Sequence, residues 1–571
     1  MSGSAADIAA LGGRSELAVG SAQRDRLTAA LATWWPLLAI LLLAAALRLS
    51  TLGLQSFWYD EAFTPVHVLR ASFGATLHNV VHTENTPPLW YVLEWGVSRV
   101  LGTGVVALRL LSALAGIATV AVAWAIGSEL AGRRVAIVTA ALVAVNPLFV
   151  WYSQEARAYA LFVFTASLAL LCFLRAMRAL TNRRLAEFAL SASLALLTHY
   201  FAVFLLIPMA LWLLWFAITG EWSDESAMPR ARGGGIANST DSDARPESGS
   251  HPHAHGIKSD DRGGAQLTSQ AQTSNPKNLP RVLCALALTG LVGLALIPLA
   301  IAQGGHGTQW IGEWALASRL EAIPQYYLTG YSGSPLGHGI EALVALVILA
   351  GVLYGLWSTL TRREEHGALI VLTITAAAVL TPVLLALLGA DYLAPRNLVA
   401  AMVPLSALLA IVIAAQRTGR IGMALAGLLA FAFFVLSVDV NLSPRLQRGD
   451  WSGVAGVLRS AQPKHVITTV ELGSAPLEYY LPRLDNLHAG RSVSVTEIDE
   501  TGYAPLRRDA ERTPARGFHL AERRDINGLM VYRFISSTPV TISRGTLLHA
   551  VIAEEGRPEA LVPIASSGKT L

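Results

Sequence analysis

Long runs of apolar residues, separated by short polar stretches, dominate the first 440 residues of this chain of 571. A helix of about 18 to 22 apolar residues crosses the roughly 30 Å hydrocarbon core of a bilayer, and a buried helix of a soluble protein rarely runs as far without a charge. The pattern therefore predicts about eleven membrane-spanning helices. They are expected at residues 34–49, 105–127, 135–153, 156–178, 185–200, 201–219, 281–301, 340–360, 367–389, 397–414 and 420–438.

Basic residues between these runs indicate which side of the membrane each loop occupies. If every run crosses once, the basic clusters all fall on one side, which the positive-inside rule assigns to the cytoplasm. The amino-terminal tail, residues 1–31, falls on that side, and the first run lacks a signal-peptide cleavage site, so we expect a retained first span. The chain then ends outside. The clusters are Arg14 with Arg24 and Arg26, Arg133-Arg134, Arg183-Arg184, Arg362-Arg363, and Arg417 with Arg420.

Residues 87–101 form a shorter apolar stretch that would reverse this topology if it crossed the membrane. The stretch contains Glu94 and Arg99, and charges inside a spanning helix are unfavourable. We therefore expect a juxtamembrane or half-inserted helix, which belongs to a first external loop at residues 51–104.

Two long segments do not follow the apolar pattern. Residues 220–280 are rich in Gly, Ser, Asp, Arg and His without hydrophobic periodicity, which predicts a disordered cytoplasmic loop. Its His251–His255 cluster could bind a metal, but a tract without order offers no preformed coordination geometry. Residues 440–571 alternate strand-like and helix-like runs, which predicts a small external α/β domain after a membrane module at 32–439. The strand-like runs are Val466–Val470, Val493–Ile498 and Leu529–Phe534, and a helix is expected at Trp451–Ser460.

Composition agrees with a membrane protein and excludes several classes of function. Hydrophobic residues make up 53% of the chain and charged residues 14%, and the mean hydropathy is +0.47. These values lie outside the range of ordinary soluble domains. A net charge of +4, spread along the chain, does not suggest nucleic-acid binding. The two cysteines, Cys172 and Cys284, lie in apolar runs, so we expect packing residues rather than a disulfide or a cysteine metal site.

The first external loop carries the most informative motif. Three aromatic residues, at positions 57–59, precede two adjacent carboxylates, Asp60 and Glu61. One interpretation is an aromatic belt at the membrane surface, followed by solvated acids. The alternative is functional, because an acid that aromatic rings partly shield from water can have a raised pKa and act as a general base. The same loop later contains the stretch His82–Tyr91, with two adjacent prolines.

Other charged and aromatic residues are expected on the same external side. Glu155 and Arg157 lie in a turn between two spans, where a purely local ion pair is the alternative interpretation. Arg396 begins a span on the outer side, where the positive-inside rule disfavours arginine, so it requires an anionic partner such as a lipid phosphate. His199 lies in an external turn, where a lone histidine is more often a membrane anchor than a catalytic residue. An aromatic external loop, residues 302–339, could stack on sugars or rest on lipid.

The order of these motifs resembles the glycosyltransferase family 39 superfamily over roughly residues 34–440. The motifs are an outer-loop Trp-Tyr-Asp-Glu, a Thr-Pro-Pro-Leu start of a helix, an Asn-Pro…Glu-Ala-Arg-Ala-Tyr turn, a Thr-His-Tyr turn and a late Pro-Arg-Asn. The superfamily includes protein O-mannosyltransferases, aminoarabinose transferases and lipopolysaccharide-core transferases. The resemblance implies the type C glycosyltransferase fold, a polyprenyl-phosphate-linked sugar donor, and inverting transfer on the periplasmic or lumenal face. The loop at 220–280 and the lack of a lumenal repeat insert depart from the O-mannosyltransferases, which weakens the case for a protein acceptor.

The resemblance also implies roles for individual residues. Asp60 is the expected catalytic base, and Glu61 an acid that positions the acceptor. Arg157 and Arg396 are the expected ligands of the donor phosphate. Inversion needs one base on the acceptor side and positive charge on the leaving-phosphate side, which these residues can supply. Four further residues of these motifs are taken as substrate-binding: Tyr59, Glu155, Tyr159 and His199.

The sequence thus predicts a multi-pass plasma-membrane glycosyltransferase whose site faces outward and whose acceptor is an unspecified cell-envelope component. No metal or cofactor is indicated, and dependence on a divalent ion stays open. A transporter or lipid flippase is the alternative, although such proteins usually place ionisable residues near the bilayer midplane and show internal repeats. A non-catalytic assembly factor is a third possibility, but it would not need acids beside Tyr59.

Overall fold

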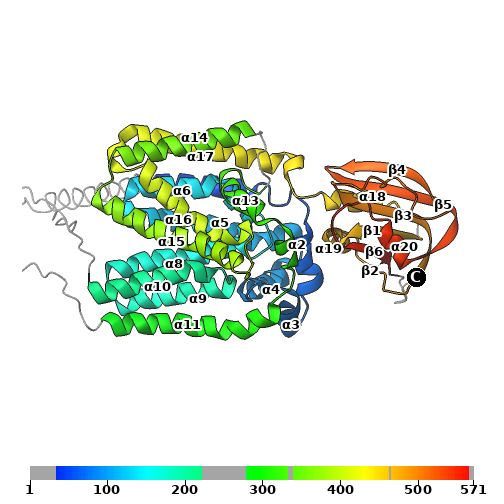
Figure 1. Cartoon of the computed structure of the whole chain (residues 1–571), viewed down its shortest axis with the longest axis horizontal. Helices are drawn as coiled ribbons and strands as arrows, with labels where there is room; N and C mark the ends of the chain where they lie inside the picture. The colour runs from blue at the N-terminus through cyan, green and yellow to red at the C-terminus, as the bar shows by residue number, and fades with distance from the viewer. Residues whose placement is uncertain (1–33, 221–277, 332–337, 462–463, 565–571) are drawn as a thin grey trace, which may run out of the picture.

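The structure is a computed structural model, and it describes residues 34–220, 278–331, 338–461 and 464–564. A bundle of helices forms one end of the elongated molecule, and a domain built on a six-stranded sheet forms the other (Figure 1). The prediction of a helical membrane module followed by a small α/β domain is therefore confirmed. The amino-terminal tail and residues 221–277, with the His251–His255 cluster, lie outside the described residues.

Within the described residues, seven helical segments of the bundle are long and apolar enough to cross a membrane. An eighth is a bent pair, α6 (Arg133–Val145) and α7 (Pro147–Ser153), whose axes differ by 57°. Three further helices complete the predicted set: Trp34–Leu49, α9 (Asn182–Thr198) and α14 (His338–Trp357). Each of the eleven predicted spans thus coincides with a described helix. The seven are α5 (Val105–Ala131), α8 (Tyr159–Arg178), α10 (Ala202–Thr219), α11 (Asn278–Gln303), α15 (Arg362–Leu387), η2 with α16 (Pro395–Ile413), and η3 with α17 (Gln416–Leu442).

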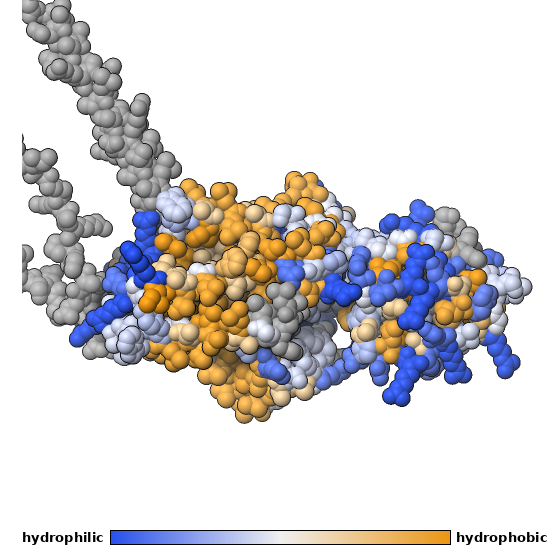
Figure 2. Space-filling view, turned by 90° about the horizontal axis from the view of Figure 1, so that it is seen from above, coloured by the Kyte–Doolittle hydropathy of each residue, from blue (hydrophilic) through white to orange (hydrophobic). Residues whose placement is uncertain are grey.

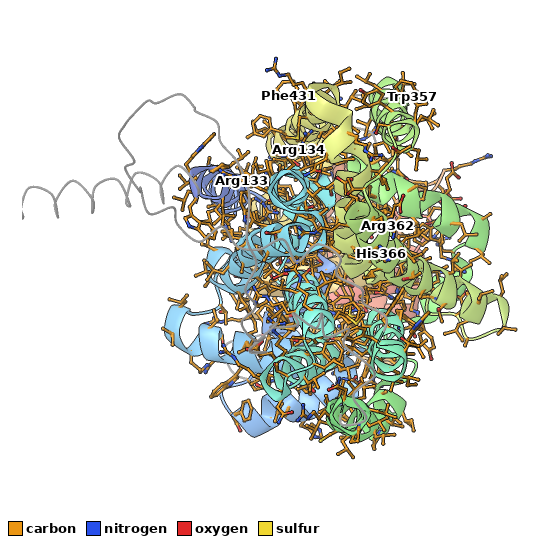
Figure 3. All side chains as sticks on the ribbon, turned by 90° about the vertical axis from the view of Figure 1, so that its left-hand side faces the viewer. Arg133, Arg134, Trp357, Arg362, His366 and Phe431 are labelled. Atoms are coloured by element: carbon orange, nitrogen blue, oxygen red, sulfur yellow. The ribbon has the colours of Figure 1, made fainter. Side chains whose placement is uncertain are left out.

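In the view of Figure 2, apolar residues cover most of the middle of the bundle, hydrophilic residues gather at the end away from the sheet domain, and the sheet domain carries many hydrophilic residues. Large side chains such as Trp357 and Leu388 are 80% and 82% exposed on the bundle. Such exposure is unfavourable in water but not in lipid. At the end of the bundle away from the sheet domain lie Arg133, Arg134 and Arg362 (Figure 3). The chain is a multi-pass membrane protein.

The bend between α6 and α7 follows from the Asn146-Pro147 sequence. Pro147 has no backbone N–H, so the carbonyl of Val143, four residues earlier, loses its helical donor. Arg48 of the first helix supplies the missing donors: its Nη2 lies 3.1 Å from the Val143 carbonyl, and its Nη1 lies 2.8 Å from the Ala144 carbonyl. The fully buried guanidinium therefore stabilises the bend that directs α7 and the following turn toward the sheet domain.

Short helices lie at the end of the bundle that faces the sheet domain (Figure 1). They occupy the loops that the sequence predicts to be external. α4 has 13 residues and is too short to cross a bilayer, and the prediction of a juxtamembrane helix at 87–101 stays a prediction. The elements are α2 (Tyr59–Phe63), η1 (Thr64–Val68, a π-helical turn), α3 (Phe73–Thr83), α4 (Leu89–Leu101), α12 (Gln309–Glu313) and α13 (Leu316–Thr329).

The sheet domain has the strand order β2-β6-β1-β3-β5-β4, in which only β1 and β3 pair in parallel. The three predicted strands and the predicted helix are present. One face of the sheet packs against α18 (Trp451–Leu458) and α19 (Glu471–Tyr480), and α19 contacts α2 of the bundle. The other face packs against α20 (Arg544–His549). The strands are β1 (His465–Val470), β2 (Leu484–Asn486), β3 (Ser492–Tyr503), β4 (His519–Ile526), β5 (Leu529–Ser543) and β6 (Pro558–Pro563).

Candidate active site

An ion pair between Asp60 and Arg396 lies at the end of the bundle nearest the sheet domain. Arg396 Nη1 donates to Asp60 Oδ2 at 2.7 Å, and the two side chains are 20% and 18% exposed. Asp60 is in the first turn of α2, whereas Arg396 begins the η2–α16 span 336 residues later. The guanidinium lies 4.9 Å from the Trp310 ring and 5.9 Å from the Tyr159 ring. Asp60, Tyr159 and Arg396, which the sequence predicted separately, thus lie close together. The Asp60 carboxylate is partly exposed to solvent.

A second ion pair holds Arg157 in the turn between α7 and α8. Its Nη2 lies 3.1 Å from Glu84 Oε2, and its Nη1 lies 3.4 Å from Glu84 Oε1. Tyr91 donates a further hydrogen bond to the same carboxylate. Glu84 and Tyr91 both come from the stretch with paired prolines. The partner of Arg157 is therefore in the first external loop and not in its own turn, contrary to the local pair that the sequence left open.

Glu61, next to Asp60, has a different environment. The Glu61 side chain is fully buried. Arg109 of α5 forms hydrogen bonds to both carboxylate oxygens: its Nε donates to Oε1 at 2.7 Å and its Nη2 donates to Oε2 at 2.6 Å. The Ala156 N–H also donates to Oε1, at 2.9 Å. A planar guanidinium matches a carboxylate in this two-bond geometry. Glu61 therefore fixes the first external loop to α5 and to the 154–158 turn. Arg109 also donates to the carbonyls of Leu52, Gln55 and Ser56.

Arg448 is a buried residue of this region that the sequence analysis did not identify. It follows α17, in the segment that leads into the sheet domain, and its Nη2 donates to Glu155 Oε2 at 2.9 Å. Its Nε lies 3.6 Å from Glu61 Oε2, and its guanidinium lies 4.1 Å from the Trp151 ring. Burial raises the pKa of Glu155 to about 7, although the charge of Arg448 acts in the opposite direction. The sequence around Arg448 is polar, so it does not indicate that the side chain is buried. The burial results from tertiary packing against residues far away in the sequence.

His199 lies in the turn between α9 and α10, stacked on the Phe162 ring at 4.6 Å. Burial lowers the pKa of His199 to about 3, and the charges of Arg396 and Arg157 act in the same direction. The imidazole is therefore neutral. Its Nδ1 accepts the N–H of Phe201 at 3.2 Å, so Nε2 carries the hydrogen. His199 is a fixed neutral donor beside two arginines.

Aromatic side chains surround the Asp60–Arg396 pair. Trp151 stacks on Tyr331 at 5.2 Å, and Trp58 lies 6.1 Å from the same ring. The indole nitrogens of Trp58 and Trp151 and the hydroxyl of Tyr152 are buried without a hydrogen-bond partner in the described residues. Tyr59 rests against Phe63, and burial, with the charge of Asp60, raises its pKa to about 12. These groups offer donors and ring faces of the kind that hold sugars.

The sheet domain contacts the loop that carries Asp60 directly. The Phe57 N–H donates to the hydroxyl of Tyr480 at 2.8 Å, and the Ser56 hydroxyl donates to Asp450 Oδ1 at 2.9 Å. Phe57 and Ser56, which make these contacts, lie three and four residues before Asp60 in the sequence. The position of the acid therefore depends on the sheet domain as well as on the bundle. In the described residues, no group of three or more His, Cys, Asp or Glu side chains could hold a metal ion.

Comparisons with known proteins agree with one part of the sequence resemblance. The family model described as dolichyl-phosphate-mannose-protein mannosyltransferase matches residues 85–230, a segment that contains Glu155, Arg157, Tyr159 and His199. The resemblance is confirmed for that segment. No curated protein matches the chain.

Solved structures similar to the chain include those of two proteins. The Archaeoglobus fulgidus oligosaccharyltransferase in complex with zinc and sulfate is 16% identical, with a TM-score of 0.43, and the match covers 78% of this chain and 57% of that one. The same enzyme with an inhibitory peptide and a dolichol-phosphate is 14% identical, with a TM-score of 0.44 and coverage of 79% and 60%. ArnT from Cupriavidus metallidurans bound to undecaprenyl phosphate is 14% identical, with a TM-score of 0.37 and coverage of 88% and 98%. The chain spans under two thirds of the oligosaccharyltransferase.

Proposed function

We propose that the protein is a membrane glycosyltransferase of the type C fold that uses a polyprenyl-phosphate-linked sugar as donor. It transfers the sugar, with inversion, to a cell-envelope acceptor on the external side. The observation that carries this proposal is the partly exposed Asp60–Arg396 ion pair at 2.7 Å, with Arg157 and the neutral His199 nearby. A potential base and potential phosphate ligands thus occupy one end of the bundle.

In the proposed reaction, the donor phosphate takes the place of Asp60 at Arg396. The carboxylate that this releases accepts the proton of an acceptor hydroxyl. The acceptor oxygen then forms a bond to the anomeric carbon as the bond from that carbon to the phosphate oxygen breaks, and the electron pair stays on the leaving phosphate. The positive charges of Arg396 and Arg157 stabilise the anion that develops there. Glu61 serves as a positioning residue for the loop that carries Asp60, because Arg109 occupies both its oxygens.

The orientation is part of the proposal. The basic residues Arg133, Arg134 and Arg362 lie at the end opposite the sheet domain (Figure 3), which the positive-inside rule assigns to the cytoplasm. The amino terminus is then cytoplasmic and the sheet domain external. A reporter that is active only outside the cytoplasm should be active when fused at Ser443 and silent when fused within 221–277. The reverse pattern would overturn the external site.

Transfer itself is tested with the purified protein in lipid nanodiscs. It is incubated with radiolabelled polyprenyl-phosphate sugars and a crude envelope acceptor fraction, beside the Asp60→Asn variant. Label should move to the acceptor only with the wild type. If label moves equally with both proteins, Asp60 is not the base. If no donor is used and the intact lipid-linked sugar instead crosses the bilayer of a vesicle, the flippase alternative replaces the proposal.

A further inference from the structure

The sheet domain contains a cavity of about 630 Å³ that shares no residue with the candidate active site. It opens on the face of the sheet that α20 covers, and α18 and α19 lie on the opposite face, toward the bundle. Cavities of roughly 300–1,000 Å³ hold small organic ligands, so this one is large enough for a sugar unit and not only for an ion. Polar side chains and small apolar ones share its wall, and no Phe, Tyr or Trp contributes to it.

Glu500 of β3 supplies a buried polar group to this cavity. Its side chain is on a residue only 2% exposed, and its Oε1 has no hydrogen-bond partner in the described residues. A buried oxygen without a hydrogen-bond partner is unfavourable, so a ligand that supplies a partner is favoured. Burial raises the pKa of Glu500 to about 9. At neutral pH the group is therefore an uncharged carboxylic acid that can both donate and accept a hydrogen bond.

Two arginines give the cavity a positive charge. Arg507 is fixed by its Nη1, which donates to the His549 carbonyl at 3.1 Å, and its Nε lies 3.5 Å from Asp509 Oδ1. Asp509 therefore balances Arg507. The side chain of Arg512 lines the same cavity and has no hydrogen bond or ion pair within the part of the chain that the structure describes. Arg512 is therefore the arginine of this cavity that has no ion-pair partner among the described residues.

Hydroxyl groups complete the wall, from Thr513, Ser543 and Thr546. Hydroxyls and a neutral acid suit a ligand with many hydroxyl groups, and the uncompensated arginine suits one anionic group on that ligand. The lack of aromatic surface disfavours an apolar ligand such as a lipid chain. A sugar that carries one anionic group meets all three conditions.

We propose that this cavity is a second saccharide-binding site, specific for a glycan that carries one carboxylate or phosphate group. Arg512 and Arg507 contact the anionic group, and Glu500 exchanges hydrogen bonds with sugar hydroxyls. Binding at this site does not depend on sugar transfer. A binding experiment therefore tests this proposal separately from the proposed glycosyltransferase activity.

The test is a binding titration of the full-length protein in nanodiscs by isothermal calorimetry. The probes are galacturonic acid, which has one carboxylate, mannose 6-phosphate and the neutral disaccharide maltose. One or both acidic sugars should bind, and maltose at least about tenfold more weakly, because one charge-assisted hydrogen bond contributes about 1.5–3 kcal/mol. Binding of only one acidic sugar identifies the anionic group as carboxylate or phosphate.

Variants assign the binding to the cavity. Arg512→Gln changes an exposed side chain and should lower the affinity for the acidic sugar about tenfold or more. Arg516→Gln, which removes an exposed arginine from the same loop outside the cavity, should leave the affinity unchanged. The proposal is overturned if neither acidic sugar binds saturably, if maltose binds as tightly, or if the two variants behave alike.

Discussion

Replacing Asp60 by asparagine is expected to abolish sugar transfer while it strengthens binding of the lipid phosphate. The two effects have one cause, which is that Asp60 occupies Arg396 in the structure. A donor phosphate must displace this carboxylate before it can reach the guanidinium. Asparagine keeps the size of the side chain but removes both the competing charge and the base.

The geometry sets the size of each effect. The side chains of Asp60 and Arg396 are 18% and 20% exposed, which places the pair between a surface ion pair of about 0.2–1 kcal/mol and a fully buried one. Allowing for solvent screening, its loss should favour the phosphate by about 1 kcal/mol, or roughly fivefold in Kd. Loss of a general base should lower turnover by about 10² to 10⁴-fold.

Binding is measured by calorimetry with undecaprenyl phosphate, and turnover with the radiolabelled donor. Glu129→Gln is the matched control, because Glu129 is 19% exposed and pairs with Arg178 at 2.9 Å at the opposite end of the bundle. The control should change neither quantity. If Asp60→Asn binds the lipid phosphate no more tightly than the wild type, the competition between carboxylate and phosphate at Arg396 does not exist. If the variant keeps near-normal turnover, Asp60 is not the base.

Three further substitutions test the surroundings of this pair. Arg396→Lys should lose most activity while the fold persists, because lysine keeps the charge but not the two-bond fork; full activity would make Arg396 a membrane anchor. Glu61→Gln should destabilise the protein by about 3–5 kcal/mol in a denaturation assay, because it leaves the buried Arg109 unpaired; an unchanged midpoint would refute the scaffold role. The pKa of Glu155, about 7, lies above its unfolded value of about 4.5, so its contribution to stability is complete below pH 4.5 and lost as pH rises through 7. Glu155→Gln should therefore flatten the fall in melting temperature between pH 5 and 8, and an unchanged slope would show that another group titrates there.

The spans and the strands could be predicted because both depend on local pattern. The apolar runs and the alternation in residues 466–470, 493–498 and 529–534 are visible in the sequence itself. Arg396 could also be recognised, since an arginine on the outer side requires an anionic partner. The sequence suggested a lipid phosphate as the anionic partner of Arg396. In the structure that partner is the Asp60 carboxylate.

The different environments of Asp60 and Glu61 could not be predicted, because they depend on which long-range partner reaches each acid. For Glu61 a signal was present but unused: Arg109 lies inside a predicted span, and an ionisable residue there requires a buried partner. Arg448 gave no such signal. Its burial results from the way the linker packs against Trp151 and Glu155, which no local pattern records.

Arg48 also has a consequence for the order in which the chain is built. The carbonyls that it serves are synthesised 95 and 96 residues later, which corresponds to roughly 5 to 20 seconds of translation at 5–20 residues per second. Through that interval the side chain, one residue from the end of the first helix, is solvated by headgroups and water. The final hydrogen bonds of Arg48 can therefore form only after residues 143–147 have been made, so the first helix and the α6–α7 bend complete each other's contacts late in synthesis.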